Sequence, residues 1–139
     1  MKKQIGIWID TIHAHIIHFH ENEPVFETIE SGIVPHERFE GEGKRFTRVG
    51  SVYIDFEKNE ERRFDQHMDD YLEKVMAAAK EADELLIFGP AQTRIKLGKK
   101  IETEKSMHKM VVVNEAAEDM TERQMIAHVR QHFAPHVVG

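Results

Sequence analysis

The sequence predicts an α/β protein: a single-domain sandwich (1–139) in which a mixed five-stranded sheet is covered by helices, with the element order β-β-β-α-β-α-β-α. Three observations carry this prediction. The N-terminal residues read as three short strands separated by turns. A long helical pattern follows, and then two apolar runs that are each followed by a further helical pattern. Strands joined by tight turns pair antiparallel, whereas strands joined through helices pair parallel, so the sheet is expected to be mixed.

The three N-terminal strands are predicted from apolar residues bounded by turns. Ile5, Ile7 and Ile9 stand at alternate positions of an almost wholly apolar run, as expected for a strand buried on both faces. The tripeptide "TIH" turns the chain into a second strand, "AHIIHFH". The tetrapeptide "ENEP" then turns it into a third, "VFETIESGIV", which ends before Pro35.

The helices are predicted from apolar residues spaced three and four apart. The longest pattern covers residues 59–82, with Asn59 as its N-cap, and a short strand is expected just before it within "VGSVYIDF". After the buried strand "ELLIF", the pair "GP" starts a second helix. The run "MVVV" is the last strand, and Thr121 and Gln124 form a capping box for the final helix.

The composition is that of a globular chain. Hydrophobic residues make up 40% and charged residues 32% of the chain, and 139 residues suffice for one core. No apolar run approaches the roughly 18 residues that span a bilayer, so no membrane partner is expected. The absence of cysteine excludes disulfides and thiolate chemistry and fits a cytoplasmic location. No P-loop or dinucleotide fingerprint is present, so no cofactor is expected.

Two basic clusters stand out against a net charge of −6. In the first, "GEGKRFTR", Gly41 and Gly43 precede the cations, and Phe46 supplies an aromatic ring for base stacking. The second, "RIKLGKK", contains no acid. A solvated helix face gives the same pattern, but an acidic chain that contacts nucleic acid needs such a local basic patch. The cations of the two clusters are Lys44, Arg45, Arg48, Arg94, Lys96, Lys99 and Lys100.

The run "HAHIIHFH" invites interpretation as a metal site, but strand geometry argues against it. Side chains alternate between the two faces of a strand, so His13 and His15 share one face while His18 and His20 share the other. Four ligands do not converge from such a strand without a bulge. We therefore expect no metal here, and these histidines are interpreted as solvated or edge-strand residues that titrate near neutral pH.

Three carboxylates offer an alternative metal site. Asp10 ends the first strand and Glu115 follows the last one, with Asp55 as a third candidate. Strand ends that meet at one edge of a sheet can hold a divalent cation, as in metal-dependent phosphodiesterases. Roles in turns and caps explain Asp10 equally well.

The order of elements and motifs resembles the middle domain of archaeal and eukaryotic class I peptide release factors, of Pelota-type rescue proteins and of their bacterial homologues. The stretch "GEGKRFTR" stands where that family has a glycine-rich loop before a long helix. "DELLIFGPAQTRIKLGKKIE" resembles its strand, small-residue turn and amphipathic helix, and "MVVVNEAAEDMTERQMIAHVRQHF" resembles its closing strand and helix. The resemblance covers nearly the whole chain and implies this fold, with contact to ribosome or tRNA.

The glycine-rich loop departs from the family in its chemistry. Release factors carry Gly-Gly-Gln there, whereas this loop reads Gly41-Glu42-Gly43-Lys44. The resemblance therefore does not imply peptidyl-tRNA hydrolysis, and we expect a non-catalytic protein that contacts ribosome or tRNA through its two basic clusters. Two alternatives stay open: the metal-dependent phosphodiesterase, and a homo-oligomeric interaction module in which an edge strand such as "VFETIESGIV" pairs across a homodimer.

Overall fold

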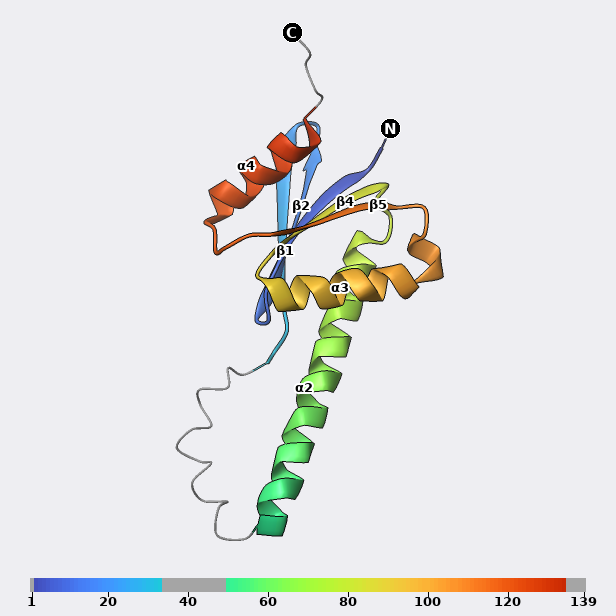
Figure 1. Cartoon of the computed structure of the whole chain (residues 1–139). Coiled ribbons are helices and arrows are strands. Elements are labelled where there is room, and N and C mark those ends of the chain that lie inside the picture. The colour runs from blue at the N-terminus through green and yellow to red at the C-terminus, as the bar shows by residue number, and fades with distance from the viewer. Residues whose placement is uncertain (1, 34–49, 135–139) are drawn as a thin grey trace.

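The computed structural model describes the backbone of residues 2–33 and 50–134, together with the side chains of these ranges apart from 50–61 and Ala91. Five strands form one sheet in the order β3-β2-β1-β4-β5 (Figure 1). Neighbours pair antiparallel from β1 to β3, while β4 is parallel to both β1 and β5. The predicted mixed five-stranded sheet is thus confirmed. The strands are β1 (Gln4–Ile9), β2 (His13–His20), β3 (Glu23–Glu30), β4 (Glu84–Gly89) and β5 (Val111–Ala116).

Helices cover both faces of the sheet (Figure 1). The long helix α2 (Gly50–Ala79), α3 (Ala91–Thr103) and the short 3₁₀ helix η3 (Lys105–Met107) lie on one face, and α4 (Glu122–Phe133) lies on the other. The sandwich therefore has three layers, with a core on each side of the sheet. No helix in the described ranges combines the length and apolar character needed to cross a membrane.

The central strand β1 supplies both cores, as its apolar sequence predicts. Ile5, Ile7 and Ile9 pack with α2 and α3, while Trp8 packs with α4 on the opposite face. Gly6 also faces α4, because a Cβ built there would lie 2.4 Å from Cγ2 of Val129. The absent side chain thus lets α4 approach the middle of the sheet.

Two further elements agree with the sequence prediction. Thr121 caps α4: its hydroxyl accepts from the Gln124 N–H, while the Gln124 side chain accepts from the Thr121 N–H. The β2–β3 hairpin turns at Glu21 and Asn22, both with positive φ, of 50° and 70°. Two left-handed residues make the tight turn whose twist suits a two-residue hairpin.

The predicted start of the long helix is wrong. The structure begins α2 at Gly50, so the expected strand within "VGSVYIDF" is helical from that residue on, and Asn59 lies inside the helix rather than at its cap. The β-branched residues Val52 and Ile54 favour a strand locally. However, Val52 and Phe56 are four residues apart, and Phe64 follows eight residues after Phe56, so all three fall near one face of a helix. The longer helical period overrides local propensity.

Candidate functional site

The four cations of "RIKLGKK" all lie on α3, but they do not form one patch. Arg94 turns toward β5, Lys96 and Lys100 turn toward α2, and Lys99 is exposed. The reason is the helical period, which places residues four apart on one face and their neighbours about 100° away. The sequence correctly predicts that the four cations lie along one helix. It does not predict that their side chains point in different directions.

Arg94 fastens α3 to the edge of the sheet. Its guanidinium Nη1 donates to Oδ1 of Asn114 over 2.7 Å, and Asn114 Nδ2 donates back to the Arg94 carbonyl over 3.0 Å. The Arg94 Nε is buried and has no hydrogen-bond partner within the described residues. Gly98 lies against this pair, since a Cβ there would lie 2.6 Å from Asn114 Nδ2 and would shift the end of the Asn114 side chain. In this conformation Arg94 has a structural role.

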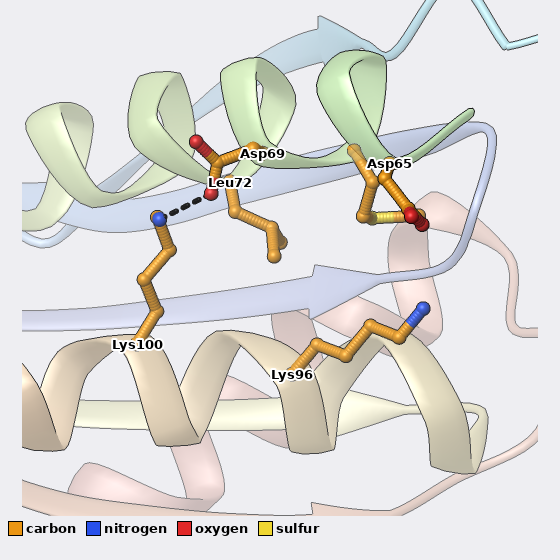
Figure 2. Close-up of a pocket in the computed structure, with 6 residues that line it drawn as sticks. Asp65, Asp69, Leu72, Lys96 and Lys100 are labelled. Atoms are coloured by element: carbon orange, nitrogen blue, oxygen red, sulfur yellow. Dashed lines mark hydrogen bonds and ion pairs between the residues drawn. The ribbon is translucent and has the colours of Figure 1, made fainter. Parts of the chain in front are cut away.

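Lys100 is neutralised by two carboxylates of α2. Its ammonium group forms an ion pair with Asp69 (Figure 2). It forms a second ion pair with Glu73 over 3.1 Å. The hydrogen bond to Asp69 is the main cause that raises the Lys100 pKa above its ordinary value. A cation held by two acids in this way has little positive potential left for a phosphate.

Lys96 and Lys99 are the cations of α3 that remain most available. The Lys96 ammonium lies 5.4 Å from the Phe64 ring centroid, a cation–π distance, and the Lys96 residue is exposed. The adjacent hollow between α2 and α3 has a volume of about 290 Å³ (Figure 2). Its lining mixes two lysines with two aspartates and two apolar residues, so it is not a basic pocket: Asp65, Met68, Asp69, Leu72, Lys96 and Lys100.

The first basic cluster lies outside the described residues: Gly41, Gly43, Lys44, Arg45, Phe46 and Arg48. The structure does place the start of the helix that follows it in the sequence. At Gly50, two residues after Arg48, α2 begins at the end of the molecule farthest from the sheet (Figure 1). All α2 side chains in the core belong to its C-terminal part, from Phe64 onward among those described.

The histidines of β2 divide between faces as the sequence predicts. His13 and His15 lie together with ring centroids 4.5 Å apart, and Trp8 lies within 6 Å of both. His15 also stacks on Phe26, and its Nδ1 lies 3.0 Å from the Thr28 hydroxyl. Burial, and then the neighbouring His13, lower the pKa of His15. This is a packed aromatic row on the face of the sheet that carries α4.

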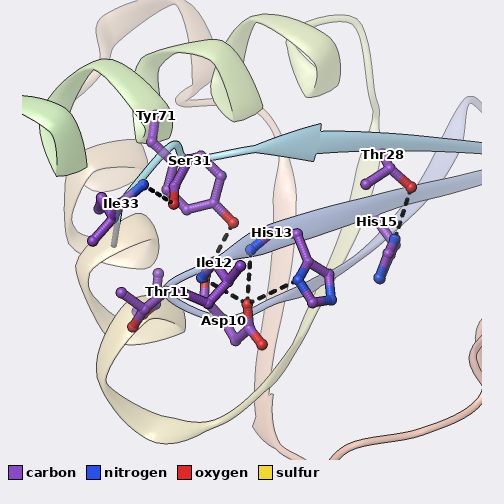
Figure 3. Close-up of polar contacts among 10 residues, drawn as sticks. Asp10, Thr11, Ile12, His13, His15, Thr28, Ser31, Ile33 and Tyr71 are labelled. Atoms are coloured by element: carbon purple, nitrogen blue, oxygen red, sulfur yellow. Dashed lines mark hydrogen bonds and ion pairs between the residues drawn. The ribbon is translucent and has the colours of Figure 1, made fainter. Parts of the chain in front are cut away.

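Asp10 closes the turn between β1 and β2 (Figure 3). Its carboxylate accepts the backbone N–H groups of Ile12 and His13 at 2.9 and 2.8 Å, and lies 3.6 Å from His13 Nδ1. The buried Tyr71 hydroxyl donates to the Asp10 carbonyl over 2.9 Å. Asp10 therefore has the role in a turn that the sequence suggested, and these contacts occupy its Oδ1 atom.

Glu115, the second candidate metal ligand, is paired with a histidine. Its carboxylate hydrogen-bonds Nε2 of His128, whose ring packs on Phe88 with centroids 4.8 Å apart. A shallow hollow of about 470 Å³ lies beside this pair, between residues 118–120 and α4. The side chain of Asp55, the third candidate, is not among those described. Within the described side chains no group of three His, Asp or Glu residues is arranged to hold a metal ion.

The valines of β5 are exposed, which was not predicted from the sequence. Val111, Val112 and Val113 are 61%, 36% and 38% exposed, although "VVV" reads as a buried strand. The order of the elements along the chain is the feature from which this exposure could have been predicted. A last strand reached through a helix can be added at the border of a sheet, where its outer side has no neighbour.

No protein-family model matches the chain, and no curated protein matches it. The resemblance to release-factor middle domains therefore stays a prediction, carried by the motifs quoted above.

Proposed function

We propose that this protein is a non-catalytic module, similar to release-factor middle domains, that contacts RNA of the translation machinery on the ribosome or on tRNA. The observation that carries the proposal is the projection of α2. This helix has 30 residues, which corresponds to about 45 Å at 1.5 Å per residue. Its N-terminal end, next in sequence to "KRFTR", stands clear of the sheet (Figure 1).

The charge distribution supports this arrangement. The whole chain carries a net charge of −6, so a phosphate backbone is repelled by the protein as a whole. A contact with RNA therefore needs local cations, and "KRFTR" supplies three of them without an acid. On α3, Lys96 and Lys99 supply the second contact, while Arg94 and Lys100 hold the helix in place through Asn114 and Asp69.

Catalysis of peptidyl-tRNA hydrolysis is not part of the proposal. That chemistry rests on Gly-Gly-Gln in the release factors, and the loop here contains Gly41-Glu42-Gly43-Lys44 instead. The proposed role is binding alone.

The test is co-sedimentation with ribosomes, and filter binding of tRNA, at a series of salt concentrations. We expect wild-type binding to weaken as salt rises, because each phosphate contact releases counterions. The double variants Lys44→Glu/Arg45→Glu and Lys96→Glu/Lys99→Glu should each weaken binding about tenfold or more at low salt. Each should also make the salt slope shallower, by about one for every phosphate that the variant no longer neutralises.

The matched control is Lys74→Glu/Lys80→Glu, which makes the same change of charge at an exposed position of α2 and at another just beyond its end. If the control weakens binding as much as the test variants, the effect is one of net charge and the assigned surface is wrong. Absence of binding to both ribosomes and tRNA at low salt overturns the proposal.

A further inference from the structure

The outer side of β5 is both apolar and unpaired. Among the described residues β5 has β4 as its one neighbour in the sheet. The register with β4 sets Val113 beside Leu86, on the α4 face, and Val112 beside Leu85, on the α3 face. The exposed valines therefore present apolar surface on both sides of the same edge.

The hydrogen bonds to β4 identify which backbone groups of β5 point outward. Val111 N–H donates to the Asp83 carbonyl and Ala117 N–H to the Gly89 carbonyl, over 3.0 and 2.9 Å. In a parallel pair, successive residues point alternately toward and away from the neighbouring strand. The N–H and C=O groups of Val112 and Asn114 and the C=O group of Met110 therefore face away from β4, while the Met110 N–H donates to the Met107 carbonyl over 3.2 Å.

The opposite edge of the sheet carries the features that prevent pairing, and the first four residues of β5 do not. β3 has glutamates at Glu23, Glu27 and Glu30, with Pro24 near its start. Charge and proline are the usual protection of an edge strand. The stretch "VVVN" of β5 has neither. Of the two edges, β5 is thus the one suited to adding a strand, rather than the "VFETIESGIV" edge suggested by the sequence.

We propose that β5 pairs antiparallel with β5 of a second copy of this chain, about a two-fold axis at Val112, so that two sheets become one continuous sheet. In this register Val112 faces Val112 of the second copy, and Met110 faces Asn114. The two Val112 residues exchange both of their outward hydrogen bonds, and the Asn114 N–H donates to the Met110 carbonyl of the second copy.

The same register matches the side chains. Val111 lies opposite Val113 of the second copy, which joins two exposed valines at a pair without hydrogen bonds, where side chains are closest. Lys109 lies in the turn before β5 and takes no part in this ladder.

Cysteine cross-linking tests the pairing and its register together, because the natural chain contains no cysteine. A hydrogen-bonded pair has its Cα atoms about 5.5 Å apart, within the range that a disulfide bridges. Val112→Cys is therefore expected to give a covalent dimer on oxidation. Val113→Cys is the matched control: two residues of offset place its two copies about 8 Å apart, beyond the limit of about 7 Å.

A second measurement is light scattering across a range of protein concentrations. We expect a concentration-dependent dimer, weakened about tenfold or more by Val112→Lys and left unchanged by Ile12→Lys, which alters another exposed apolar residue. Circular dichroism establishes that each variant is folded.

Two outcomes overturn the inference. One is a strict monomer at the highest concentration reached, in which case the β5 edge is left for a strand of another protein. The other is cross-linking of Val113→Cys as fast as, or faster than, Val112→Cys, which excludes this register. Neither outcome bears on RNA binding, because the proposed RNA contacts lie on α3 and before α2.

Discussion

At the residue scale, two neighbouring lysines of α3 have different surroundings. Lys100 is paired with Asp69 and Glu73, whereas Lys99 has no ion pair within the described residues. The sequence predicts both as members of one basic cluster. It could not predict the difference, because the two acids come from a helix that is distant along the chain and meets α3 only in the folded state.

Substitution of these two lysines separates stability from binding. Lys100→Met should lower the free energy of unfolding by up to about 1 kcal/mol, because partly exposed ion pairs contribute little, and should leave RNA binding nearly unchanged. Lys99→Met should leave the melting temperature unchanged and weaken RNA binding. Thermal melts and filter binding of the two variants check both statements, and the reverse pattern would assign the contact to Lys100.

His15 gives the fold a dependence on mildly acidic pH. Burial, and then the adjacent His13, lower its pKa in the folded protein below the ordinary value of 6.5. A lowered pKa contributes stability that is present above the unfolded-state value and is lost as the pH falls through the folded-state value. We therefore expect the free energy of unfolding to fall as the pH drops below about 6.5.

Denaturant unfolding at neutral pH and near pH 5 measures this effect. The variant His15→Phe should lose less stability on acidification than the wild type, since a neutral ring takes the same place between His13 and Phe26. His20→Gln, at an exposed position of β2, should keep the wild-type profile. An NMR titration that places the His15 pKa above 6.5 would contradict the assignment.

At the element scale, the seat of α4 on the sheet depends on Gly6. Gly6→Ala places a methyl group against Val129 and should cost about 1–3 kcal/mol of stability, since overpacking displaces the helix. Val129→Ala alone leaves a cavity and is also destabilising. The double variant should be more stable than the sum of the two losses predicts, because the new methyl group occupies the vacated space. If the losses in free energy of unfolding of the two single variants simply add in the double variant, residues 6 and 129 do not make this contact.

Most of the fold could be predicted from the sequence, for identifiable reasons. The alternating isoleucines of β1, the turn at Glu21 and Asn22, and the capping box at Thr121 are local signals, and local signals were sufficient. The start of α2 was missed because β-branched residues favoured a strand where the helical period continues. The candidate site was predicted less well, since the partners of Arg94 and Asp10 are set by tertiary contacts with Asn114 and Tyr71.

At the scale of the whole molecule, self-association through β5 couples stability to concentration. If the folded dimer forms and the unfolded chain does not associate, mass action stabilises the folded state as protein concentration rises. We expect the melting temperature of the wild type to rise by about 2 °C or more for each tenfold in concentration once dimers predominate. The Val112→Lys variant should melt at a constant temperature across the same range. A wild-type melting temperature independent of concentration would contradict the dimer.

The place of β1 in the sheet has a consequence for synthesis of the chain. Its antiparallel neighbour β2 follows directly, but its parallel partner is distant in sequence, with Gln4 beside Glu84. Such non-local pairing slows folding, since a long loop must close before the contact forms. At translation rates of about 5–20 residues per second, the first three strands emerge several seconds before β4 is made. The nascent chain thus carries the β4-facing edge of β1 uncovered during that interval, and it is this edge, rather than either border of the finished sheet, that a chaperone would have to shield.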